Sequence, residues 1–430
     1  MPARITGLTT RLITVPLLRS WGAEAPENHV IVTELTTDDG GTGHGFSWTP
    51  TIGPQAVKAL LDYDIAPFVT GLEANPDMVW DQLWKRLHEA GGGGLTTIAM
   101  AGVDLALWDL MARTAGTSVT GLLGQRHESV EVYGSGVNLH YSLDQLVEQA
   151  QRWVAAGHNA VKIKVGKPEL REDAERVAAV RQVIGPDRLL MIDANQRWDL
   201  AHTFRALDAL GEYGLEWLEE PLRADDLWAY RRLRKHSPVP IALGENVHTI
   251  YRFRDFIEAE AVDIIQPNIV RVGGITPFRR IVELARANSI RVAPHLLPEL
   301  SGQLALTLAE AVSVEDVEDA SFEQLGILAG GSPVKISASS GRSLLSSTGR
   351  PGLGFDFNLG FDFNAAPTVL PVAETAAAES GAAESADPAT GAPEAAAPKS
   401  AAPETAGRES AGPESAVPDS KGNRIEYSNS

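Results

Sequence analysis

The feature that most limits the possible folds is a regular alternation of segment types that begins near residue 130. Short apolar runs of about four to six residues alternate with amphipathic stretches of about ten to fifteen, which is typical of a parallel sheet covered by helices. An open, doubly wound sheet and a closed barrel share this alternation. The expected strands are VEVYGS, AVKIKV, LLMIDA, LEWLEE, PIALGE, VDIIQP, RVAPH and a short one at VSVED.

Three acidic residues stand at the ends of three successive expected strands. Asp193 follows LLMI, Glu219 follows LEWL and Glu245 follows IALG, at intervals of 26 residues, or one strand and one helix. Strand parity turns all three inward, and the equal spacing predicts equal heights. Converging carboxylates repel one another unless a hard cation lies between them, so we expect Mg²⁺, with Mn²⁺ as a substitute. The alternative is that they are ordinary helix N-caps.

This convergence favours closure of the sheet. The predicted fold class is α/β, with a (β/α)7β TIM-type barrel over residues 129–330. Two lysines in the run VKIKV, Lys162 and Lys164, share the inward parity. Inward ammonium groups are costly in a dry core, so we expect them at the mouth of the barrel, opposite the carboxylates. Solvated edge positions are the alternative for these lysines.

Later strands add further polar residues at matching positions: Asn268 in QPNIV, His295 in VAPH, and Glu315 in SVED. Asn195, two residues after Asp193, shares its face and could orient a ligand or touch a substrate. The predicted arrangement places Lys164 on one side of the metal and His295 on the other. Each residue also has a plain alternative, since Asn268 could cap a loop, His295 could be structural and Glu315 could be solvated.

Residues 1–128 predict an α+β capping domain. Two strand-like segments and the turn DDGG indicate a β-meander, and three helical patterns follow it. Residues 331–364 should return to pack on this cap, and residues 365–430, rich in Ala, Pro, Glu and Ser, should form a disordered tail. The cap residues expected to contact substrate lie in its first two loops; they are Arg19, Trp21, His29 and Trp48.

Charge and composition exclude several classes of partner. A formal net charge of −19 and a pI near 5.0 argue against a nucleic-acid or anionic-membrane partner, either of which requires a basic face. The chain has no cysteine, which excludes thiolate catalysis and Cys-ligated zinc. No uninterrupted run of about 18 apolar residues occurs, so the expected location is cytoplasmic. The expected partner is a small-molecule carboxylate, and barrels of this kind commonly form homo-oligomers.

Taken together, these motifs resemble the mandelate racemase subgroup of the enolase superfamily. The resemblance covers about residues 1–360 and rests on the ALWDL helix, the KxK pair, DANQRWD, WLEEP, GEN, PNxxRxGG and PGLG. It implies an N-terminal cap on a barrel and Asp193, Glu219 and Glu245 as metal ligands. It also implies roles for four further residues. Lys164 is the general base, Lys162 its electrostatic support, His295 the acid or base on the opposite face, and Glu315 a donor to a substrate oxygen.

One position departs from the family pattern, since Asn268 stands where the subgroup usually has an Asp paired with the histidine. A neutral amide stabilises a protonated imidazole less, so His295 should be a weaker base and a readier acid. This favours dehydration of an aldonic or aldaric acid to a 2-keto-3-deoxy acid. The alternatives are a racemase, epimerase or lactone cycloisomerase that uses the same enolate, and a non-catalytic binding barrel.

Overall fold

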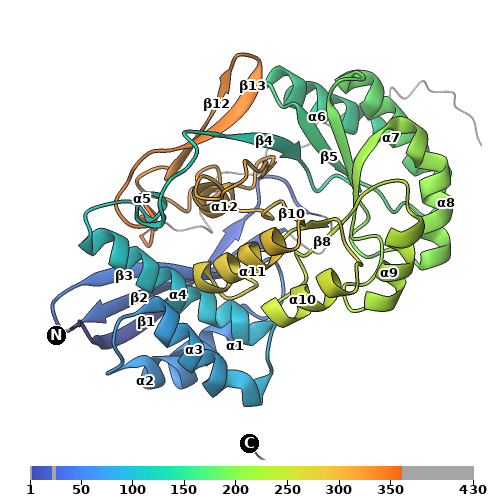
Figure 1. Ribbon diagram of the computed structural model, residues 1–430. Helices are drawn as coiled ribbons and strands as arrows, with labels where there is room; N and C mark the ends of the chain where they lie inside the picture. Colours follow the sequence, from blue (N-terminus) through green and yellow to red (C-terminus); the bar gives the residue numbers. More distant parts are fainter. Residues whose placement is uncertain (1, 22–25, 361–430) are drawn as a thin grey trace, which may run out of the picture. The chain divides into compact units, whose positions relative to one another are not determined.

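The computed structural model describes residues 2–21 and 26–360, which belong to one compact unit. Its N-terminal part is a small α+β region, and its central part is an eight-stranded parallel barrel with surrounding helices (Figure 1). The tail predicted over residues 365–430 lies outside the described residues.

The N-terminal region starts with the predicted meander. Strands β1 (Ile5–Pro16), β2 (Glu27–Thr37) and β3 (Thr42–Thr49) form an antiparallel sheet in the order β1-β2-β3. The DDGG segment makes the second turn, where the Thr37 N–H donates to the Gly41 carbonyl (3.0 Å) and Gly40 takes a φ of 84°. A positive φ suits glycine, which explains the residue type at that position.

The meander is followed by a helical layer. Its elements are α1 (Pro54–Ala59), a π-helical turn (Leu60–Ile65), α2 (Ala66–Val69), α3 (Pro76–Leu87), α4 (Leu95–Thr114) and α5 (Val119–Leu123). Helix α4 lies against β3, where a side chain on Gly43 or Gly45 would strike the backbone of α4 at 2.1 or 2.2 Å. The two glycines of TGHGF therefore permit the close approach of helix and sheet.

Helix α4 is long and apolar enough to cross a membrane by length and composition alone, but 83% of its most apolar window is buried within the protein. It lies between the cap sheet and the barrel, and the Trp108 indole N–H donates to Thr276 Oγ1 of the barrel (3.0 Å). Burial on all sides explains the lack of a polar face. Helix α4 is therefore a core helix that packs between the cap sheet and the barrel.

A buried acid on α4 contacts the barrel. Asp104 is 2% exposed and accepts from the Thr276 N–H (3.0 Å) at the start of α11 (Ile275–Ala287). Burial raises the pKa of Asp104 to about 7, although the hydrogen bonds from Thr276 oppose this rise. Between about pH 4 and pH 7, Asp104 is therefore protonated in the folded protein. In the unfolded chain its carboxyl group has the ordinary pKa of 3.8 and has lost the proton.

We expect this proton to make stability depend on pH. The contribution is complete below about pH 4 and is lost as pH rises to about 7, because the folded-state pKa lies above the unfolded one. Relative to Asp104→Asn, the parent should lose up to about 4 kcal/mol of unfolding free energy across that range. Urea denaturation of both proteins between about pH 4 and pH 8 measures this difference, and parallel curves would contradict it.

The central region contains eight strands and the seven helices between them, which confirms the (β/α)7β fold class. The strands are β4 (Val130–Ser135), β5 (Ala160–Lys164), β6 (Leu189–Asp193), β7 (Leu215–Glu219), β8 (Ile241–Leu243), β9 (Ile264–Ile265), β10 (Arg291–Val292) and β11 (Val314–Val317). The intervening helices are α6 (Leu143–Ala155), α7 (Leu170–Ile184), α8 (Leu200–Leu210), α9 (Leu227–His236), α10 (Ile250–Glu258), α11 and α12 (Pro298–Ala305).

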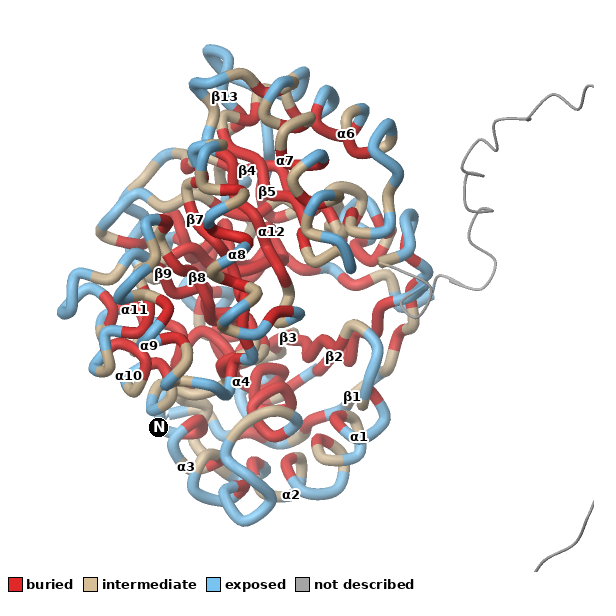
Figure 2. Tube along the Cα trace, turned by 90° about the vertical axis from the view of Figure 1, so that its right-hand side faces the viewer, coloured by how far each residue is buried: buried red, intermediate tan, exposed pale blue. Residues whose placement is uncertain are grey.

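Hydrogen bonding runs in the order β11-β4-β5-β6-β7-β8-β9-β10, with every pair parallel. Four of the barrel helices begin at a side chain that caps the first turn, as the sequence chemistry favours. These caps are Ser142, Asp199, Asp226 and Thr249. Buried residues follow the strands and α4 (Figure 2).

The chain after the barrel contacts both the cap sheet and the first barrel strand. Residues Phe355 and Phe357 contact Phe46 of the cap sheet, with ring centroids 5.2 and 5.8 Å away. Before them, β12 (Val334–Ser339) and β13 (Arg342–Ser347) form a hairpin whose second strand pairs antiparallel with β4. This hairpin was not predicted; residues 331–364 were expected to contact the cap alone.

Candidate active site

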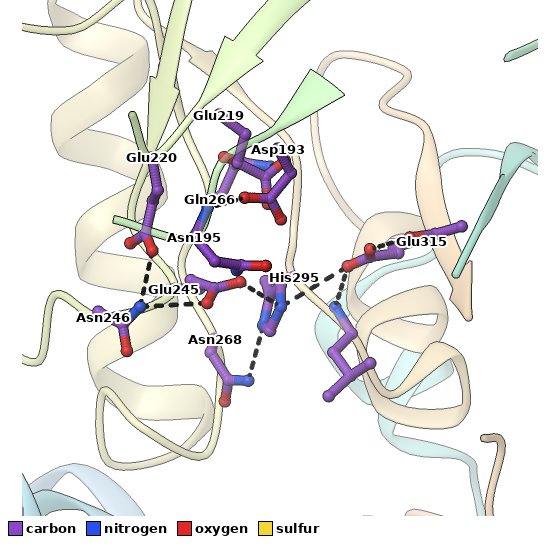
Figure 3. A network of polar contacts seen from close by, with 12 residues as sticks. Asp193, Asn195, Glu219, Glu220, Glu245, Asn246, Gln266, Asn268, His295 and Glu315 are labelled. Carbon is purple, nitrogen blue, oxygen red and sulfur yellow. Dashed lines mark hydrogen bonds and ion pairs between the residues drawn. The ribbon is translucent and has the colours of Figure 1, made fainter. Parts of the chain in front are cut away.

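Three acidic side chains meet at the carboxyl ends of neighbouring barrel strands. Asp193 ends β6, Glu219 ends β7, and Glu245 follows β8 by two residues. Each offers a carboxylate oxygen within 4.8 Å of the others, so together they could hold a metal ion. Figure 3 shows the three side chains turned toward a common point. None of the three is the N-cap of a barrel helix in the described chain, so the N-cap alternative fails.

The equal spacing of the three acids predicted that they lie at one height in the hydrogen-bonded ladder. This prediction is wrong for Glu245. Asp193 pairs with Glu219, but Glu219 pairs with Ala242, three residues before Glu245. The chain leaves the strand at Gly244, which has a φ of 148° and lies so close to Gln266 that an added Cβ would meet its N at 2.6 Å. This irregular turn, rather than strand register, brings Glu245 to the other two acids.

The two inward lysines lie against these acids, as parity predicted. Lys162 Nζ lies 2.7 Å from Glu219 Oε1 and 2.8 Å from Glu315 Oε1, and Lys164 Nζ lies 2.5 Å from Asp193 Oδ2. Burial disfavours both ammonium groups, but the carboxylates outweigh it and raise the pKa of each lysine. Both side chains are buried, so solvated edge positions are excluded.

The described cluster has more carboxyl groups than amines. Its two lysines form ion pairs with Asp193, Glu219 and Glu315, and two further buried acids, Glu220 and Glu245, lie in the same cluster. Glu220 was not among the predicted site residues. Its Oε2 accepts from Gln196 (3.1 Å) and Asn246 (2.8 Å), while its buried Oε1 has no partner among residues 2–21 and 26–360. Oxygen donors with excess negative charge are the environment that a hard divalent cation requires. The residues therefore fit Mg²⁺.

Glu219 is oriented by two uncharged donors that the sequence analysis did not identify. Its Oε2 accepts from the Trp217 indole N–H (3.1 Å) and from Gln266 Nε2 (2.6 Å), while its Oε1 faces Lys162. Donors of this kind fix the direction of a carboxylate's remaining lone pairs. Burial raises the pKa of Glu219 to about 7 despite Lys162, which shows how much the site depends on compensating charge.

We expect Trp217→Phe to weaken Mg²⁺ binding about tenfold, because it removes one of these donors while keeping an aromatic ring at the position. Trp198→Phe is the matched control, since Trp198 is also buried and its indole N–H has no partner in the described structure. Calorimetric titration of both variants measures the effect. Equal affinities would show that the Trp217 contact does not orient Glu219.

His295 lies between two acids and a neutral amide. Its Nε2 is 2.6 Å from Glu245 Oε2 and 3.8 Å from Glu315 Oε2, and its Nδ1 is 3.0 Å from Asn268 Nδ2. The Asn268 amide has a defined orientation, because its Oδ1 accepts from the backbone N–H groups of Val270 and Arg271, both at 3.1 Å. Those groups can only donate, so Nδ2 must face the imidazole.

This orientation fixes the tautomer of neutral His295. Asn268 Nδ2 donates, so Nδ1 of the imidazole accepts. The one N–H proton of the neutral ring is therefore on Nε2. The Nε2–H points at Glu245, an acceptor, which agrees with that assignment. In its neutral form the histidine therefore presents a proton, and no lone pair, to the site.

Glu315 is held by four neighbours. It accepts from Ser135 Oγ (2.7 Å) and the Leu296 N–H (3.1 Å), and it faces Lys162 and His295. Burial alone would favour the protonated form, but Lys162 and His295 outweigh it and lower the pKa of Glu315 to about 2. An ionised carboxylate only accepts hydrogen bonds, so these contacts do not support the predicted donor role in this state.

The remaining predicted residues make contacts of several kinds. The Asn195 N–H donates to Asp193 Oδ1 (2.8 Å), and Arg19 forms an ion pair with Asp319, just after β11. Trp21 packs edge-on against Trp48 with ring centroids 6.3 Å apart. His29 and Trp48 were expected in loops, but they lie in β2 and β3. His29 Nδ1 contacts Thr14 Oγ1 (3.0 Å) in the neighbouring strand.

Two family models match most of the chain. The mandelate racemase/muconate lactonizing enzyme N-terminal domain matches residues 7–124, and the enolase C-terminal domain-like family matches residues 145–360. One similar curated protein is a 3,6-anhydro-α-L-galactonate cycloisomerase of Streptomyces coelicolor, 38% identical over 63% of this chain and 76% of the relative. Another is the L-talarate/galactarate dehydratase of Salmonella typhimurium, 35% identical over 63% and 68%.

Solved structures agree with these matches. A racemase from Streptomyces coelicolor with bound magnesium has a TM-score of 0.75 at 32% identity, covering 82% of this chain and 97% of that one. The L-talarate dehydratase of Polaromonas in complex with Mg and L-glucarate has a TM-score of 0.73 at 34% identity, covering 83% and 95%. Magnesium is thus the cation of these relatives, and the three acids here could hold the same ion. The chain is an enzyme of the mandelate racemase/muconate lactonizing enzyme group of the enolase superfamily.

Proposed function

We propose that this enzyme eliminates an oxygen substituent from the β-carbon of a sugar acid, counted from its carboxylate. Lys164 removes the proton from the α-carbon, which lies between the carboxylate and the β-carbon. His295 gives a proton to the oxygen that departs. When that oxygen is a hydroxyl group, water is lost, and the resulting enol becomes a 2-keto-3-deoxy acid. The substrate class is an aldonic or aldaric acid.

The contact between Asn268 and His295 carries this proposal. It leaves the proton of neutral His295 on Nε2, facing the site, which suits a group that protonates a leaving oxygen. Reversible racemisation or epimerisation would also require His295 to accept a proton at Nε2, where the neutral ring has no lone pair. A bound Mg²⁺ would add positive charge beside the substrate carboxylate and so stabilise the enolate.

Individual residues are assigned as follows. Asp193, Glu219 and Glu245 would hold the metal, since their oxygens converge. Lys162, fixed between Glu219 and Glu315, would supply positive charge to the developing enolate. Asn195 and the cap residues Arg19, Trp21, His29 and Trp48 are proposed to contact the rest of the substrate. A cytoplasmic location and a homo-oligomeric state remain expectations.

A second candidate is cycloisomerisation, which the similarity to a 3,6-anhydro-α-L-galactonate cycloisomerase supports. The same elimination would apply to a substrate whose departing oxygen belongs to a ring. That oxygen stays attached to the product, so the ring opens and no water is lost. The two candidates therefore share their residues and differ in the substrate that the barrel mouth accepts.

The test is incubation with Mg²⁺ and a panel of aldonic acids, aldaric acids, their lactones and their anhydro derivatives. A keto acid lighter than its substrate by one water indicates dehydration, and a keto acid of equal mass indicates ring opening. Deuterium entering recovered substrate in D₂O, without keto acid, would instead indicate an epimerase or racemase. No turnover across the panel, with Mg²⁺ bound, would refute the proposed elimination.

A further inference from the structure

The barrel interior below the acids combines large and small side chains. The next inward layer consists of Tyr133, Ala160, Met191, Trp217, Ala242, Ile264 and Ala293, all buried. Barrel layers usually contain bulky branched residues, but three of these seven are alanine. The rings of Tyr133 and Trp217 meet edge to face, with centroids 5.8 Å apart, and occupy part of the space.

A cavity of about 380 Å³ opens beneath this layer. It is lined by the amino-terminal ends of the strands, including Ala160 of β5, Leu189 of β6 and Arg291 of β10, each the first residue of its strand. The last turn of α11 and the segment before β11 complete its wall. The acids stand at the carboxyl ends of β6 and β7, so the cavity lies at the opposite end of the barrel.

The charged groups that line this cavity are paired with one another. Arg291 Nη2 lies 2.7 Å from Glu216 Oε1, and Arg286 Nε lies 3.3 Å from Glu310 Oε1. The deeper lining includes Met191, Ile264 and Ala293. A charged occupant would lose hydration without gaining an unpaired counter-charge from this described lining, whereas an apolar one would gain buried contact.

We propose that this cavity is a second ligand site, which takes an uncharged, largely apolar molecule of one or two rings. Its volume lies within the range of small-molecule sites and exceeds the roughly 150 Å³ that accommodates benzene in a protein interior. The site differs in ligand class from the acid cluster, which is proposed to hold a cation and, beside it, the carboxylate of the substrate.

The occupant would touch a side chain that also contacts the acid cluster. Trp217 lines the cavity, and its indole N–H donates to Glu219 Oε2 (3.1 Å). Movement of this ring would therefore change the orientation of Glu219. Occupancy and Mg²⁺ affinity should affect each other by the same factor, of about fivefold or more; this link rests on the proposed role of Glu219 as a metal ligand.

Indole is a suitable probe, with indole-2-carboxylate as its charged counterpart. We expect indole to bind in the cavity in a soaked crystal and to raise the melting temperature of the full chain, and the carboxylate to do neither. Ala160→Leu fills the floor of the cavity, and Ala311→Trp covers its wall from an exposed position that folding tolerates. Each should weaken indole binding at least about tenfold, while Ala311→Ser should not.

Three results would overturn parts of this proposal. Absence of indole from the cavity, or unchanged affinity in Ala311→Trp, would refute the site. Tighter binding of the carboxylate would refute the ligand class. Equal indole affinity with and without Mg²⁺ would refute the link to Glu219. Indole binding needs neither substrate nor turnover, so a failure of the proposed elimination would leave the site itself intact.

Discussion

Lys164→Met should lower the rate of elimination by at least about 10³-fold, within the range that a positioned base contributes. Lys164 ends β5 with its Nζ 2.5 Å from Asp193 Oδ2, so the amine lies beside one of the proposed metal ligands. Methionine keeps the length and apolar stem of lysine but has no proton acceptor of comparable strength. Steady-state turnover of the best substrate in the panel measures this loss.

Metal affinity distinguishes a lost base from a damaged site. Removing a positive charge from beside Asp193 should leave Mg²⁺ affinity unchanged or increase it, because an ammonium group competes with the cation for that carboxylate. Lys235→Met, an exposed lysine in the last turn of α9, controls for the substitution itself. Elimination that stays within tenfold of the parent would remove Lys164 from the mechanism.

The sequence predicted the strand positions and much of the cluster, because both depend on simple periodicities. Parity within VKIKV turned Lys162 and Lys164 inward, and both are buried against acids. The matching ends of strands six and seven predicted that Asn268 and His295 would be neighbours, and they are in hydrogen-bond contact. These inferences require only that side chains alternate and that parallel strands end at one edge.

Other features depend on irregular backbone, which periodicity does not describe. Parity would turn Glu220 away from the barrel, but its φ of 36° ends the strand and returns its carboxylate to Asn246. Glu245 likewise reaches the cluster through the turn at Gly244. Trp217 reads as an ordinary core residue in LEWLEE, although its place two residues before Glu219 puts both on one face, a signal that could have been used.

Asn268→Asp should convert His295 from a proton donor into a proton acceptor. Aspartate has the same shape, and one of its oxygens can still accept from the Val270 and Arg271 N–H groups. Its other oxygen would replace the amide Nδ2 that now donates to His295 Nδ1, so Nδ1 must carry the proton instead. Nε2 of the neutral ring then presents a lone pair to the site, and aspartate also stabilises the imidazolium that forms when this lone pair takes a proton.

Two rates should therefore move in opposite directions. At a pH where the ring is neutral, elimination should fall on the order of 10²-fold, because Nε2 then carries no proton for the leaving oxygen, and exchange of the substrate's α-proton from the histidine face should appear in D₂O. Mass spectrometry of recovered substrate and of keto acid follows both in one experiment. His295→Gln is the matched control, since an amide still forms hydrogen bonds but neither gives nor takes a proton, so it should lower elimination without producing exchange. If Asn268→Asp left both rates at the parent values, the tautomer of His295 would not govern the reaction, and the assignment of elimination over epimerisation would lose its structural support.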